Sequence, residues 1–117
     1  MLFVNYPKCT TCQKAKRWLT ENGFDFIDRD IKADRPCYEE LKKWIQSSGL
    51  PIKRFFNTSG LLYKSLQLKD RLPAMTDEEK LELLASDGML VKRPLLIDGE
   101  TVLVGFKPDQ WEQALKK

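Results

Sequence analysis

A Cys-x-x-Cys motif, Cys9-Thr10-Thr11-Cys12, directly after a short apolar run constrains the fold of this chain more than any other feature. The apolar run at residues 1–5 predicts a buried strand, and Tyr6-Pro7 ends it just before the first cysteine. Apolar side chains then recur at helical spacing, which predicts a helix capped by Thr10 or Thr11. The motif is therefore expected at a strand-to-helix junction.

A cysteine at the amino end of a helix lies near unpaired backbone N–H groups and the positive end of the helix dipole, and both favour its thiolate. Such an environment lowers a cysteine pKa from about 8.5 to about 3.5–7.5. Lys8 and Lys14 are expected to act in the same direction. Cys9 is then the nucleophile, and Cys12, three residues later on the same helical face, resolves a mixed disulfide.

Two other interpretations of the motif are half of a structural zinc site and a chance pair of buried cysteines. The chain has no histidine, which excludes a Cys-His dyad, a Ser-His-Asp triad and any zinc site containing histidine. One further cysteine, Cys37, cannot complete a four-thiolate site. A redox pair is favoured, no metal site is predicted, and Cys37 is interpreted as an incidental thiol at the start of a later helix.

The rest of the chain predicts a second strand, several helices, a hairpin and a final helix. The second strand, at 24–30, runs parallel to the first if the helix between them is a crossover. A capping box at Thr76-Asp77-Glu78-Glu79 starts a helix that ends at Asp87-Gly88. The other expected elements are helices at 38–48, 51–56 and 61–66, a hairpin at 95–104 turning on Asp98-Gly99 or Gly99-Glu100, and a helix opened by Pro108.

This order, βαβ, helices, then ββα, predicts an α/β fold: a thioredoxin-like mixed sheet flanked by helices, with a helical insert between its halves. A chain of 117 residues has room for one hydrophobic core. We therefore expect a single domain over 1–117, with the thioredoxin-like core at about 1–32 and 88–117 and the insert at about 33–87.

Composition limits the location and the partners. Apolar residues make up 42% and charged residues 32%, the balance of a soluble globular protein, so we expect no membrane contact. The amino terminus carries no basic leader and reaches Pro7 early, which predicts a cytoplasmic protein. The net charge is +3, with both signs interspersed, so direct binding of nucleic acid is not expected.

Arg93-Pro94 is the second chemical feature, because it precedes a predicted strand that faces the Cys-x-x-Cys helix. A cis proline there could present its backbone to a bound thiol, although only about 5–6% of X-Pro bonds in folded proteins are cis. Arg93 could stabilise the Cys9 thiolate or bind an oxyanion with its planar guanidinium, or simply be a solvated arginine beside Lys92.

Four segments of the chain resemble the arsenate reductase (ArsC)/Spx family, and the resemblance extends over nearly the whole chain. It implies a thioredoxin-like fold with a helical insert, Cys9 as the redox-active cysteine, Pro94 as the family's cis proline and Arg93 as a site residue. The segments are Tyr6-Pro7-Lys8-Cys9-Thr10-Thr11-Cys12-Gln13-Lys14-Ala15, Phe55-Phe56-Asn57-Thr58-Ser59-Gly60, Leu83-Leu84-Ala85-Ser86-Asp87-Gly88-Met89-Leu90-Val91-Lys92-Arg93-Pro94 and Val104-Gly105-Phe106.

The chain also departs from the arsenate reductases it resembles, which hold their oxyanion with three arginines. Arg93 matches one of them, Asn57 stands where the first would fall with Arg54 one turn earlier, and Lys107 is near the third. The similar Spx regulators use their Cys-x-x-Cys as a thiol switch and bind RNA polymerase through a surface that includes a glycine, matched most nearly by Gly49.

These features favour an enzyme, a thiol-disulfide oxidoreductase that acts on protein or low-molecular-weight thiols through Cys9 and Cys12. No bound cofactor is expected, and glutathione/glutaredoxin or thioredoxin is the expected electron donor. One alternative is a redox-sensing Spx-type regulator that binds RNA polymerase; a second is a glutaredoxin-coupled arsenate reductase. Besides Cys9, Cys12 and Arg93, the expected thiol-binding residues are Pro94, Thr10, Thr11, Lys8 and Asn57.

Overall fold

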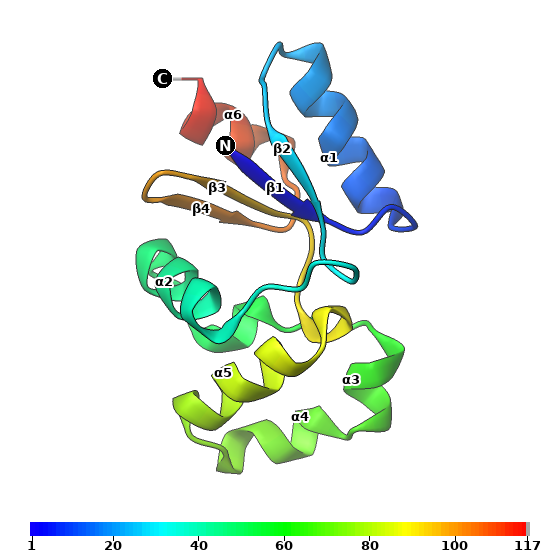
Figure 1. Cartoon of the computed structure of the whole chain (residues 1–117), viewed down its shortest axis with the longest axis vertical. Helices are drawn as coiled ribbons and strands as arrows, with labels where there is room; N and C mark the ends of the chain where they lie inside the picture. The colour runs from blue at the N-terminus through cyan, green and yellow to red at the C-terminus, as the bar shows by residue number, and fades with distance from the viewer. Residues whose placement is uncertain (117) are drawn as a thin grey trace.

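The computed structural model describes residues 1–116 and contains a mixed four-stranded sheet in the order β2-β1-β3-β4 (Figure 1). β1 (Leu2–Asn5) pairs parallel with β2 (Ile27–Asp30) and antiparallel with β3 (Leu95–Asp98). β4 (Thr101–Val104) completes a hairpin with β3. The α/β fold with a mixed sheet that was predicted from the element order is therefore confirmed.

Alternate strand residues pack on opposite faces of the sheet, as the period of two in a strand requires. Phe3, Leu96 and Leu103 pack with α1 (Thr10–Glu21) and α6 (Pro108–Leu115), which lie together on one face. The other face, which includes Val4, Leu95 and Val104, packs in a second cluster with residues of α2 (Tyr38–Ser48) and of the helices that follow it. Figure 1 shows these two layers on either side of the strands.

The segment between α2 and β3 consists of short helices. The capping box that starts α5 (Asp77–Ser86) is confirmed, because the Glu79 N–H donates to Thr76 Oγ1 at 3.1 Å and the Thr76 N–H donates to Glu79 Oε1 at 2.9 Å. The structure also contains a helical pair at 68–74 that the sequence did not predict, since elements of three or four residues show no periodicity. The elements are η1 (Ile52–Phe55), α3 (Leu61–Ser65), α4 (Leu68–Arg71), η2 (Leu72–Ala74), α5 (Asp77–Ser86) and η3 (Gly88–Leu90).

Two local predictions are refined by the structure. β2 begins only at Ile27, because Phe24 and Phe26 instead pack in the cluster beneath α1 and α6, with the Phe26 ring 5.4 Å from that of Phe3. Asp98 pairs with Thr101, so the hairpin turn consists of Gly99-Glu100, and the left-handed backbone at Gly99 (φ +60°) explains the glycine.

Contacts between segments far apart in the sequence join the sheet to α2 and to the segment after α5. Arg29 on β2 donates to both carboxylate oxygens of Glu40 on α2, at 2.6 and 2.9 Å. Gly88, just after α5, lies so close to the end of β2 that an added Cβ would overlap the carbonyl oxygen of Ile31. The residues after β2 and those before β3 are thus fixed relative to one another.

Candidate active site

Cys9 is the N-cap of α1, with extended backbone angles and a thiol that accepts a hydrogen bond from the Cys12 N–H at 3.4 Å. This corrects the prediction that Thr10 or Thr11 caps the helix. The turn after β1, in which the Cys9 N–H donates to the Tyr6 carbonyl at 3.0 Å, starts the helix one residue earlier. Thr10 and Thr11 are the first two helical residues, and both are exposed.

The thiol of Cys9 is partly buried, which by itself raises its pKa. The backbone N–H of Cys12, the Cys12 thiol and the positive charge of Arg93 stabilise the thiolate more than burial disfavours it. The net effect lowers the pKa of Cys9. Arg93 is the charged side chain that helps to lower this pKa. Lys8 and Lys14, which were expected to contribute, are exposed.

Cys12 has the opposite character. Its side chain is 1% exposed, and its sulfur accepts from the Tyr6 N–H at 3.5 Å. Burial, together with the hydrogen bond and the negative charge of Cys9, raises the pKa of Cys12 to about 12. The two sulfurs of the motif therefore form an unequal pair, an accessible acidic thiol and a covered, weakly acidic one.

Arg93 is held between two segments. Its Nη1 donates to the Met89 carbonyl at 3.3 Å, and its guanidinium lies 5.2 Å from the centre of the Tyr6 ring. The Arg93-Pro94 peptide bond is cis, and the carbonyl of the buried Pro94 accepts from the Gly105 N–H at 2.9 Å. Tyr6 and Met89 were not predicted as site residues, because backbone N–H and carbonyl groups give no signal in residue type.

A cavity of about 540 Å³ lies beside Arg93 and brings Asn57 to the same site. Leu61, 86% exposed, and Leu62 add apolar surface to it, and Asp87 adds a carboxylate. The other two positions compared with the family's arginines lie elsewhere: Arg54 lines a neighbouring cavity together with Lys92, and Lys107 is the exposed N-cap of α6.

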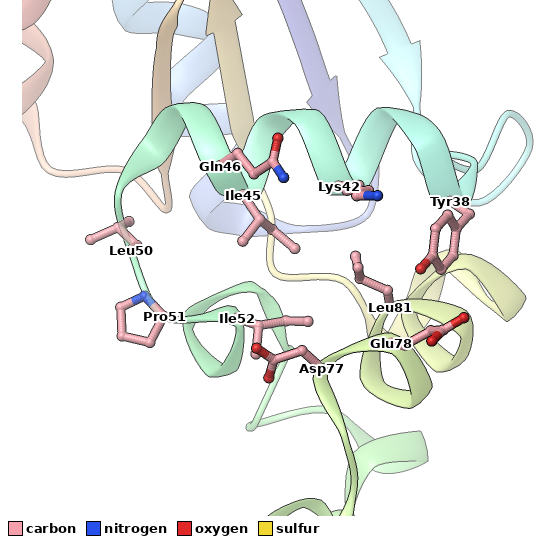
Figure 2. Close-up of a pocket in the computed structure, with 10 residues that line it drawn as sticks. All are labelled: Tyr38, Lys42, Ile45, Gln46, Leu50, Pro51, Ile52, Asp77, Glu78 and Leu81. Carbon is pink, nitrogen blue, oxygen red and sulfur yellow. The ribbon is translucent and has the colours of Figure 1, made fainter.

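The largest cavity that is described, about 560 Å³, lies away from the cysteines, between α2 and α5 (Figure 2). Tyr38, Ile45 and Leu81 point into it, and Lys42 and Glu78 add charges of both signs. None of the predicted site residues lines it.

Cys37, the third thiol, is the exposed N-cap of α2, and its N–H donates to Glu40 Oε1 at 3.0 Å. All three cysteines are free thiols. Within residues 1–116, no group of three or more His, Cys, Asp or Glu side chains is arranged to hold a metal ion. None of the helices described in that range combines the length and hydropathy needed to cross a lipid bilayer.

Comparison with known proteins finds relatives that match along nearly the whole chain. The uncharacterized protein YusI from Bacillus subtilis (strain 168) is 55% identical over 113 residues, covering 97% of this chain and 96% of its own. The regulatory protein MgsR from the same strain is 32% identical, covering 100% of this chain and 91% of its own. The global transcriptional regulator Spx from Enterococcus faecalis (strain ATCC 700802 / V583) is 30% identical, covering 95% and 83%.

Solved structures also match nearly the whole chain. A crystal structure of an ArsC family related protein from Bacteroides fragilis superposes with a TM-score of 0.93 at 58% identity, covering 96% of this chain and 94% of that one. A structure from Streptococcus mutans UA159, described as a possible arsenate reductase, superposes with a TM-score of 0.85 at 44% identity, covering 91% and 90%. The model of the ArsC family matches residues 4–114. With its thioredoxin-like sheet and its Cys-x-x-Cys at the start of α1, the chain belongs to the ArsC family.

Proposed function

We propose that this protein is a thiol-disulfide oxidoreductase in which Cys9 is the nucleophile and Cys12 the resolving thiol. The observation that carries the proposal is the inequality of the two sulfurs. Cys9 is accessible, and its pKa is lowered, whereas Cys12 is buried, and its pKa is raised to about 12. Only a thiolate attacks a disulfide at a useful rate, so the first attack falls to Cys9.

The reaction balances without a bound cofactor. The Cys9 thiolate attacks one sulfur of a partner disulfide, a new S–S bond forms, and the other partner sulfur leaves as a thiolate. Cys9 then carries no negative charge, and one of the influences that raise the pKa of Cys12 disappears. Cys12 gives its proton to the departing thiolate and attacks Cys9. The second partner sulfur leaves as a thiolate and takes a proton from water, so that the partner is released as two thiols and the Cys9–Cys12 disulfide holds the two-electron oxidation.

A thiol donor must return the two electrons in each cycle. Glutathione with glutaredoxin, or thioredoxin, is the class of donor we propose, and the cytoplasm is the compartment in which such donors keep thiols reduced. Arg93 lowers the pKa of the attacking thiol, and we propose that a protein or small-molecule disulfide binds in the cavity that Arg93 shares with Asn57. The residues next in sequence to Arg93 and to the two cysteines are also proposed to contact the disulfide partner. They are Pro94, Lys8, Thr10 and Thr11.

The test is alkylation of each cysteine by iodoacetamide across pH, measured by mass spectrometry, together with reduction of bis(2-hydroxyethyl) disulfide. Cys9 is expected to react at a lower pH than an ordinary cysteine, because its pKa is lowered, while the buried Cys12 in the folded protein reacts least. Cys9→Ser abolishes reduction, and Cys12→Ser accumulates the mixed disulfide. Cys37→Ser is the matched control and behaves as the parent protein. Full reduction activity in Cys9→Ser refutes the proposal.

A second candidate is a redox-sensing regulator that binds RNA polymerase. It is supported by the regulators MgsR and Spx, which match this chain over 91% and 83% of their own lengths. A pull-down of RNA polymerase with the reduced and the oxidised protein tests it. Binding that depends on the state of Cys9 and Cys12 supports this role, and absence of binding in both states excludes it.

Arsenate reduction is the third candidate, suggested by the likeness to the Streptococcus mutans structure. The cavity beside Arg93 carries the neutral Asn57 and the carboxylate of Asp87, a poor environment for an oxyanion. Arsenate-dependent oxidation of NADPH, coupled through glutathione and glutaredoxin, is therefore expected to stay at the background rate.

A further inference from the structure

Two neighbouring cavities in the helical segment are lined by cations. One, of about 390 Å³, includes Lys53, Arg54 and Lys92, and the next, of about 100 Å³, includes Lys53, Lys69 and Lys80. Lys53 is common to both, so the five side chains form one continuous patch, which we call the basic surface. No acidic residue lines either cavity.

The basic surface adjoins the redox site. Thr58 and Lys92 line the first basic cavity, while their chain neighbours Asn57 and Arg93 line the cavity of about 540 Å³. The segments 57–58 and 92–93 therefore each contribute one residue to either cavity, so the two cavities adjoin. A chain that lies along the basic surface would reach Arg93, whose charge acts on the Cys9 thiol.

The charge of this region exceeds that of the whole protein. Residues 51–73 contain five basic residues and one acidic residue, a net charge of +4, while the complete chain carries +3. Of the five cations of the basic surface, Lys80 lies 3.9 Å from Asp77. Among residues 1–116 the other four have no carboxylate within 4 Å. The positive potential of this face is thus largely free to act on a partner.

We propose that the basic surface binds an acidic segment of the protein disulfide that Cys9 attacks, an inference that rests on the proposed function. Aspartate and glutamate side chains complement five cations, and the two cavities also contain the exposed apolar rings of Pro51 and Pro73, which a peptide can contact. A nucleic acid fits less well, because its affinity comes mainly from neutralising many phosphates with Lys and Arg, and the net charge of the chain is only +3. Electrostatic attraction of this kind raises the association rate and is weakened by salt.

The test compares two peptide disulfides of the same length, one with Asp and Glu flanking the cysteine and one with Asn and Gln in their place. Single-turnover reduction by the reduced protein is measured in stopped flow at low and high salt. The acidic peptide is expected to react about tenfold faster at low salt, within the range that electrostatic steering provides. This advantage decreases as salt rises.

Variants locate the effect. In Lys53→Gln/Lys69→Gln the ratio of acidic to neutral peptide rates is expected to fall about fivefold, in line with the loss of two charge contacts. Lys42→Gln/Lys43→Gln on α2 removes the same charge from exposed positions outside the basic surface and serves as the matched control, for which the ratio persists. Circular dichroism confirms that both variants fold.

The outcomes separate the two proposals. If bis(2-hydroxyethyl) disulfide and both peptides are not reduced, the proposed function fails. Fluorescence anisotropy of the same acidic peptide in its thiol form then decides the docking proposal by itself. If reduction occurs with a ratio near one, or if both double variants lower the ratio equally, the basic surface does not select acidic partners. Tighter binding of a random-sequence DNA duplex than of the acidic peptide at 150 mM salt also overturns the proposal.

Discussion

The ion pair between Arg29 on β2 and Glu40 on α2 predicts a stability contribution that depends on pH. Hydrogen bonds from the Arg29 guanidinium outweigh the effect of partial burial and lower the pKa of Glu40 from 4.5 to about 2. A carboxyl whose pKa is lower in the folded than in the unfolded chain stabilises the fold above the unfolded value. The contribution of Glu40 is therefore complete above about pH 4.5 and is lost as pH falls to about 2.

The size of this contribution follows from the geometry. A fall in pKa from 4.5 to about 2 corresponds to about 3.4 kcal/mol at about 1.36 kcal/mol per pKa unit. Water screens part of it, because the Glu40 side chain is 35% exposed, although that of Arg29 is only 13% exposed. Exposed pairs contribute about 0.2–1 kcal/mol, so this half-buried, two-bond pair is expected to contribute about 1–2 kcal/mol at pH 7.

Urea unfolding of the parent protein and of Glu40→Gln, from pH 7 down to pH 3, measures this difference. The variant keeps one oxygen that can accept from the Cys37 N–H, but it loses the charge and one of the two oxygens to which Arg29 donates. We expect a deficit of about 1–2 kcal/mol at pH 7, more than half of which is gone at pH 3. Glu39→Gln, at an exposed neighbouring position, is the control and should differ little from the parent. A deficit of equal size at pH 7 and pH 3 would refute the electrostatic reasoning.

Three further substitutions test the site and the core. Arg93→Gln removes the positive charge that helps to lower the pKa of Cys9, so iodoacetamide should modify Cys9 only at higher pH, and an unchanged profile would contradict that role. Gly88→Ala places a methyl group against the Ile31 carbonyl and should cost about 1–3 kcal/mol in thermal unfolding; a variant as stable as the parent would show that this backbone contact adapts. Trp111→Phe removes the hydrogen bond from Nε1 to the Gly105 carbonyl, 3.0 Å long, and leaves space in a fully buried position, so urea unfolding should show a loss of about 1–3 kcal/mol.

The sequence predicted those elements that have strong local signals. The apolar run before the motif, the capping box at Thr76 and the Gly99 turn each correspond to an element in the structure. The turns at 68–74 were missed because their helical stretches are too short for periodicity. The strand at 24–30 was predicted too long because its aromatic residues, which favour strands, instead fill the cluster beneath α1 and α6.

At the candidate site, the sequence indicated which side chains take part. It did not indicate which groups hold them in place. The motif and Arg93-Pro94 stand out in the sequence, whereas the groups that orient them are main-chain atoms of Tyr6 and Met89, which any residue could supply. The cap itself was misassigned to a threonine because hydroxyls are the usual caps, although the Cys9 sulfur takes that place.

The burial of Cys12 imposes an order of events on any oxidation of the pair. Because Cys12 is only 1% exposed, a bulky oxidant in solution reacts with Cys9 first. Cys12 then reacts with the oxidised Cys9 rather than with the oxidant itself. A sulfenic acid formed on Cys9 would find a thiol three residues away within the same helical turn, and their condensation releases water and yields the disulfide. Under the proposed redox role, the buried thiol of Cys12 would thereby protect the partly exposed Cys9 against irreversible oxidation.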